Sequence, residues 1–171
     1  VLAVRLENRP QSSRWYPGAG LYRNVRLVTT ERVHVPVWGT QLTTPHVSAE
    51  YASVRLRTTI RNAGDADVRI STDIIAPDGK IVARKDNSRK INHGQPFEQN
   101  FLINAPSLWS PETPYLYKAV SKIYVDGKQT DEYTTRFGIR SIEIIADKGF
   151  FLNGKHRKFQ GVCNHHDLGP L

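Results

Sequence analysis

Apolar and polar residues alternate along much of this 171-residue chain, and this period of two limits what the chain can fold into. Val54, Leu56 and Ile60 share one face of the segment 53–62, and Ile70 and Ile74 continue the pattern in the segment 68–76. Successive side chains of a β-strand point to opposite faces of a sheet, so this alternation predicts half-buried strands. No segment shows a convincing period of 3.6, so the pattern predicts an all-β protein rather than an α/β layout.

Turn residues separate the alternating runs. Pro77-Asp78-Gly79-Lys80 and Asp126-Gly127-Lys128 are typical of tight hairpin turns, because proline presets φ and Asp-Gly tolerates the left-handed conformation. With strands predicted at 53–62, 68–76, 81–84, 97–103, 115–125, 130–137 and 139–145, the chain is expected to form an immunoglobulin-like β-sandwich of about seven strands. A further strand is expected at 150–155, entering an Asn-Gly turn, with its return at 158–162.

The net charge of +8 raises the question of a nucleic-acid partner. Basic residues are spread along the chain, and Arg55, Arg57 and Arg61 fit the solvated face of a sheet strand. No basic-aromatic RNA-binding signature or zinc-finger spacing accompanies them, and no apolar run approaches the roughly 18 residues of a membrane helix. We therefore predict neither a nucleic-acid nor a membrane partner.

A polar cluster near the C-terminus combines Cys163, Asn164, His165, His166 and Asp167. These residue types could bind a metal, form a Cys-His nucleophile pair, end a strand that binds a ligand, or simply form a solvated tail. Alternation places cysteine, the first histidine and aspartate on one face, which gives no closed ligand set. We predict no metal site and leave the other three interpretations open.

The acidic residues do not suggest a catalytic pair. Acid–base chemistry by two carboxylates needs both in one cleft, about 5–10 Å apart. Asp78 and Asp126 belong to hairpin turns, Asp131 and Glu132 point to opposite faces of a strand, and Glu112 lies in a Pro-rich loop. The spacing therefore identifies no catalytic residue in this chain.

Four segments resemble motifs of glycoside hydrolase family 2, in the family's order. They are residues 13–25 (SRWYPGAGLYRNV), 108–117 (LWSPETPYLY), 137–143 (FGIRSIE), and 151–155 (FLNGK) with 161–167 (GVCNHHD). The resemblance is greatest to bacterial β-galactosidases, while β-glucuronidases and β-mannosidases share the architecture. Within this pattern Trp109, Tyr115 and Tyr117 are interpreted as packing residues at the sandwich edge, and Arg140 as a structural residue.

The resemblance implies three parts of a longer polypeptide, and the absence of methionine even at position 1 fits such a fragment. Residues 1–32 would be the end of a sugar-binding jelly roll, with strands at 1–7 and 22–29. Residues 33–146 would be the sandwich, and residues 147–171 a hairpin and the first strand of a catalytic (β/α)8 barrel. The family retains anomeric configuration through two glutamates, which would both lie beyond Leu171, so this chain alone is expected to be inactive.

The resemblance also assigns substrate-binding residues in the parent enzyme. His166 and Asn164 would reach a β-galactoside from the barrel strand, although the extra Cys163 leaves the choice between His165 and His166 open. Arg14 and Trp15 could approach the sugar as a hydrogen-bond donor and a stacking surface.

The partners implied are this substrate and the neighbouring jelly-roll and barrel domains. No cofactor is expected in the chain itself. Mg or Na ions remain open for the parent, but no acidic residue stands between Asn8 and Arg23, where related galactosidases place an ion ligand. The competing function is a non-enzymatic immunoglobulin-like module that binds carbohydrate or protein.

Overall fold

A computed structural model describes residues 3–7, 9, 20–21, 24–61, 64, 66–90 and 95–163. The chain divides into two compact units, Thr30–Lys158 and a second formed by Val1–Thr29 with Phe159–Leu171. The described residues form ten strands. They contain no helix of the length and apolar character that a membrane crossing requires.

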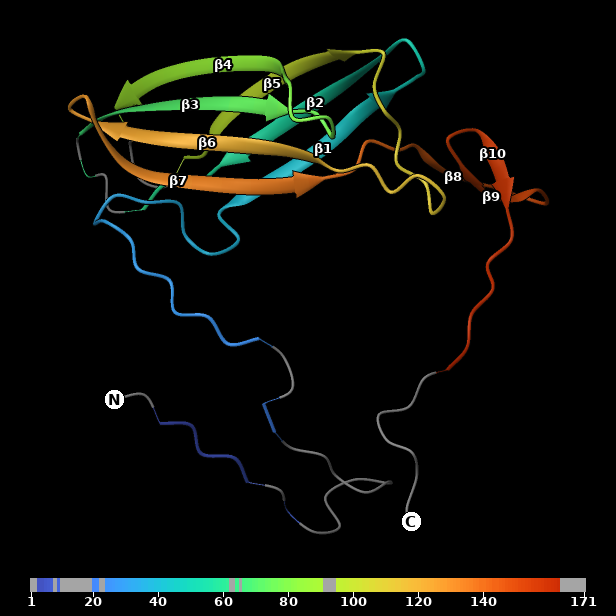
Figure 1. Cartoon of the computed structure of the whole chain (residues 1–171), viewed down its shortest axis with the longest axis horizontal. Coiled ribbons are helices and arrows are strands. Elements are labelled where there is room, and N and C mark those ends of the chain that lie inside the picture. Colours follow the sequence, from blue (N-terminus) through green and yellow to red (C-terminus); the bar gives the residue numbers. More distant parts are fainter. Residues whose placement is uncertain are drawn as a thin grey trace. The chain divides into compact units, whose positions relative to one another are not determined.

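Two antiparallel sheets make up most of the unit 30–158 (Figure 1). The first has the order β1-β2-β5 and consists of β1 (Thr40–Val47), β2 (Tyr51–Thr58) and β5 (Phe97–Asn104). The second has the order β4-β3-β6-β7 and consists of β3 (Asp67–Ile75), β4 (Ile81–Lys90), β6 (Tyr117–Val125) and β7 (Lys128–Phe137). These seven strands confirm the predicted immunoglobulin-like sandwich.

Apolar side chains from both sheets form the core between them. Burial alternates strictly along β2 and β5, as a strand with one face inward requires. One core cluster includes Val54, Leu56 and Ile103, and a second includes Ile70 and Ile123. The inward positions predicted from alternation in the sequence are therefore the positions that build the core.

A buried polar layer lies between the two apolar clusters. Along β2, β3, β5 and β6, the inward positions change from one cluster to the other at Thr58, Thr72, Gln99 and Ser121. The Thr72 hydroxyl donates to Gln99 Oε1 at 2.6 Å and lies 2.9 Å from Ser121 Oγ. Gln99 Nε2 donates to the Lys85 carbonyl and to Asn87 Oδ1, each at 3.1 Å. These bonds join strands of both sheets.

A third small sheet follows the sandwich in the order β10-β9-β8, with β8 (Ile142–Ile145), β9 (Gly149–Leu152) and β10 (Lys155–Arg157). The prediction that 139–145 closes the sandwich was wrong, because β8 pairs with β9. Ile139 instead forms a parallel bridge with Leu108.

The expected return strand at 158–162 was also wrong. Asn153 and Gly154 have φ values of 51° and 72°, which is a two-residue turn, so the return begins at once with Lys155.

The strands expected at 1–7 and 22–29 do not form in the described part of those segments, residues 3–7 and 24–29. Two strands alone bury too little apolar surface to be stable, and a further sheet would have to cover them.

Candidate functional site

The four substrate-binding residues predicted from the sequence all lie outside the described residues. These are Arg14, Trp15, Asn164 and His166, and they remain predictions, as does the choice between His165 and His166. Cys163 is described and is exposed. Within the described ranges, no three His, Cys, Asp or Glu side chains come together in a group that could hold a metal ion.

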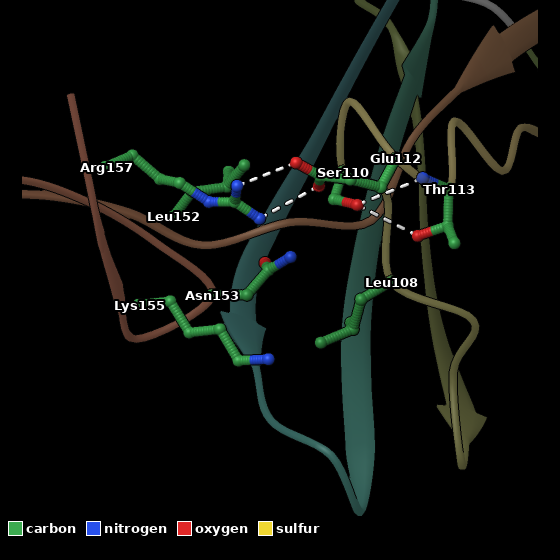
Figure 2. A pocket seen from close by; sticks show the side chains of 8 residues that line it. All are labelled: Leu108, Ser110, Glu112, Thr113, Leu152, Asn153, Lys155 and Arg157. Carbon is green, nitrogen blue, oxygen red and sulfur yellow. Dashed lines mark hydrogen bonds and ion pairs between the residues drawn. The ribbon is translucent and has the colours of Figure 1, made fainter. Parts of the chain in front are cut away.

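The described residues do form a hollow at one end of the sandwich, between the Pro-rich loop 108–114 and the β9–β10 hairpin. Its volume is about 580 Å³. Figure 2 shows the eight side chains that line it: Leu108, Ser110, Glu112, Thr113, Leu152, Asn153, Lys155 and Arg157. Two segments more than thirty residues apart in the sequence therefore meet at this hollow.

Asn153 fastens the hairpin to the sandwich. Its side-chain Oδ1 accepts a hydrogen bond from the Ser141 backbone N–H at 3.0 Å, and its Nδ2 donates to the Trp109 carbonyl at 3.0 Å. Its own backbone N–H donates to the Ser141 carbonyl, also at 3.0 Å. Asparagine suits this position because it tolerates the left-handed backbone and carries both a donor and an acceptor.

Arg157 and Glu112 form a second connection across the hollow. Arg157 Nη1 and Nη2 donate to the two Glu112 carboxylate oxygens at 2.7 and 2.8 Å, and Figure 2 shows the two groups facing each other. The hydrogen bonds from Arg157 are the main cause that lowers the pKa of Glu112. Both side chains are exposed, so this ion pair adds little to the free energy of unfolding. Its main effect is to orient the hairpin relative to the loop that contains Glu112.

Aromatic residues close the sandwich next to this hollow. The Arg140 guanidinium lies 4.8 Å from the centre of the Trp109 ring, and a side chain at Gly138 would lie 2.9 Å from the same residue. The Tyr117 hydroxyl accepts a hydrogen bond from the Ser107 backbone N–H at 2.8 Å, an arrangement similar to the tyrosine corner of immunoglobulin-like domains. The structure thus supports a packing role for Trp109 and Tyr117, and a structural role for Arg140.

The carboxylates whose pKa is shifted in the described residues all favour the charged form. Hydrogen bonds from Arg84 lower the pKa of Asp73, and backbone and side-chain hydrogen bonds from Lys80 lower that of Asp78. A general acid needs a pKa raised towards the working pH. Asp73, Asp78 and Glu112 are therefore poor proton donors.

The arrangement fixes the β9–β10 hairpin to the sandwich. The hairpin is held on one side by Asn153 and on the other by Arg157, and the chain continues from β10 towards Asn164. The sequence predicted the Asn153-Gly154 turn but gave no sign of the Asn153 side-chain bonds or of the Glu112–Arg157 pair. Both depend on residues 12 to 45 positions apart.

Comparison with known proteins shows similarity to one family over most of the chain. Residues 35–140 match the family model for Glycosyl hydrolases family 2. A β-galactosidase of Bacteroides ovatus, BoGH2A, is 43% identical over 100% of the chain and 21% of its own length. A putative β-glucuronidase of Formosa agariphila is 36% identical over 100% of the chain and 16% of its own length.

Solved structures agree. A β-glycosidase from Bacteroides vulgatus superposes with a TM-score of 0.78 and 31% identity, covering 90% of this chain and 19% of that one. The chain therefore spans about a fifth of the length of the proteins it resembles.

Proposed function

Because this chain belongs to glycosyl hydrolase family 2, we propose that it is the central, non-catalytic part of a retaining enzyme that hydrolyses terminal β-D-galactosides. A β-galactoside is proposed as the substrate because the similarity to the Bacteroides ovatus β-galactosidase extends over the whole chain. In this proposal residues 1–32 complete a jelly roll, residues 33–146 hold the sandwich and the strand β8 that follows it, and residues 147–171 begin the catalytic barrel. The two catalytic glutamates would be supplied by residues outside this chain.

The proposed role of the sandwich is to hold its neighbouring domains at fixed positions around the substrate. Asn153 and the Glu112–Arg157 pair support this role, because they fix the hairpin from which the chain leads to Asn164 and His166. Catalysis by positioned groups is sensitive to displacements of about 1 Å, so a well-fixed hairpin serves the reaction without touching the sugar.

Within the whole enzyme, we assign substrate contacts to four residues of this chain. His166 and Asn164 would hydrogen-bond sugar hydroxyls at the end of the first barrel strand, where barrel enzymes build their sites. Trp15 would stack on the sugar, and Arg14 would donate hydrogen bonds to it. We assign no Mg or Na ligand to the residues of this chain.

The His166 assignment has a direct test. In the whole enzyme, His166→Ala should lower turnover of a p-nitrophenyl β-galactoside by about tenfold or more, because a lost hydrogen bond to substrate of about 1.4 kcal/mol has that effect. The melting temperature should change little. His165→Ala is the matched control, and a loss of turnover in that variant alone would move the role to His165.

A second substrate class is favoured by the Formosa agariphila relative, which is named as a putative β-glucuronidase. Assaying the whole enzyme with p-nitrophenyl β-galactoside, β-glucuronide and β-mannoside separates the candidates. The proposal predicts the highest kcat/KM for the galactoside. Preference for the glucuronide would replace it with the second candidate, and inactivity on all three would favour a non-enzymatic binding module.

A further inference from the structure

The loop before β1 presents an exposed tryptophan in an unusual backbone conformation. Trp38 is 91% exposed, and its φ of 58° lies in the left-handed region. A bulky residue is rare there because its Cβ crowds the backbone, and glycine or asparagine is usual at such a turn position. This side chain belongs to neither core cluster and does not line the hollow of Figure 2.

Short hydrogen bonds hold the turn in place. The Gly39 N–H donates to the Pro36 carbonyl at 2.7 Å, and the Thr59 N–H donates to the Gly39 carbonyl at 2.7 Å, which ties the turn to the end of β2. A Cβ at Gly39 would lie 2.7 Å from Pro36 Cδ, so only glycine fits there. The turn therefore presents the Trp38 ring from a fixed backbone.

A small hollow of about 280 Å³ adjoins the tryptophan. Side chains with hydrogen-bonding groups dominate its lining: Thr40, Gln41, Arg57 and Thr59, together with Trp38, Gly39 and Pro96. Arg57 Nη1 donates to Gln41 Oε1 at 3.4 Å, which leaves its other N–H groups available. Arg57 makes no ion pair within the part of the chain that the structure describes.

We propose that Trp38 and this hollow form a carbohydrate-binding site for one pyranose unit, separate from the catalytic site. The apolar C–H face of a pyranose stacks on an indole, and its hydroxyls pair with amide, hydroxyl and guanidinium groups at the rim. An apolar protein partner would leave Arg57, Gln41 and Thr59 unpaired at the contact, which costs free energy. The polar lining therefore favours a hydroxyl-rich ligand.

Such a site would hold a polysaccharide near the enzyme without reacting with it. The inference goes beyond the proposed hydrolysis, and the choice of β-galactan as its ligand rests on the proposed function. A site of one ring and a few hydrogen bonds binds weakly, and its effect appears on polymeric ligands that offer many pyranose units in a row.

Electrophoresis of the whole enzyme in gels containing soluble β-galactan tests the proposal, with gels lacking polysaccharide as the reference. The wild type should be retarded by galactan, and Trp38→Ala should raise the apparent dissociation constant about tenfold. Val37→Ala is the matched control, since Val37 is the neighbouring residue of the turn and is 72% exposed. Turnover of p-nitrophenyl β-galactoside should be equal in all three proteins.

Two results would overturn the proposal. One is equal migration of the wild type and Trp38→Ala in galactan, whether both are retarded or neither is. The other is a Trp38→Ala variant with a lowered melting temperature and a parallel loss of turnover, which would assign Trp38 to packing against another part of the polypeptide.

Discussion

At the scale of single residues, Gln99 makes three side-chain hydrogen bonds within the buried polar layer. It is 1% exposed, and its amide bonds to Thr72 on β3 and to Lys85 and Asn87 on β4, although it belongs to β5 in the opposite sheet. A buried polar group without partners is costly, so these bonds have to form together in one alignment of the two sheets. The polar layer therefore helps to define how the sheets stack.

Replacing Gln99 tests this description. Gln99→Leu keeps the approximate volume but leaves the Lys85 carbonyl and Asn87 without this donor, so the free energy of unfolding should fall by about 1–3 kcal/mol. Urea unfolding of the 171-residue chain measures it. Asn100→Ala, on the outward face of β5, should change stability by less than about 0.5 kcal/mol. An equal fall in the free energy of unfolding for Gln99→Leu and Asn100→Ala would show that the hydrogen bonds of the polar layer do not stabilise the fold.

The sequence predicts the inward positions of this core well and its hydrogen bonds poorly. Alternation placed Val54, Leu56 and Ile70 on the buried faces, because side-chain direction follows from strand geometry alone. The partner of Gln99 depends on which strand of the other sheet lies opposite. Residues 27 positions away, such as Thr72, are brought there only by the complete fold.

At the scale of strands and turns, the hairpins were easier to predict than the edge strands. Asp126 and Gly127 have φ values of 49° and 80°, as the predicted tight turn requires. Strand β1 gave no clear signal, since Pro45 falls where its pairing with β2 shifts register, between Thr43 and His46. Proline is tolerated at such irregular edge positions and interrupts the alternation that reveals a strand.

The Asn153 connection should respond differently to two substitutions. Asn153→Gly keeps the φ of 51° and the backbone bond to the Ser141 carbonyl but removes the side-chain bonds to Ser141 and Trp109, so hydrogen exchange of the β10 amides should accelerate about 5- to 30-fold. Asn153→Ala should accelerate it further, because alanine also pays about 1–2 kcal/mol for the left-handed backbone.

Lys155→Ala is the control for this pair, since Lys155 is exposed and directly follows the turn as the first residue of β10. Equal exchange in Asn153→Gly and the wild type would mean that the hairpin does not depend on these side-chain bonds.

At the scale of the whole molecule, the sandwich and the family could be predicted from the sequence, whereas the hollow could not. The family motifs are contiguous segments that can be read directly, such as residues 108–117. The hollow of Figure 2 forms only when this loop and the β9–β10 hairpin come together, with Arg157 pairing with Glu112 across 45 positions. The Glu112 carboxylate at this hollow remains charged at neutral pH, because hydrogen bonds from Arg157 lower its pKa.

The most direct test compares release of p-nitrophenol from p-nitrophenyl β-galactoside by the 171-residue chain and by the whole enzyme that contains it. A non-catalytic sandwich predicts turnover by the whole enzyme and none above background by the chain alone, even when circular dichroism shows that the chain is folded. Hydrolysis by the isolated chain at a rate comparable to that of the whole enzyme would contradict this account.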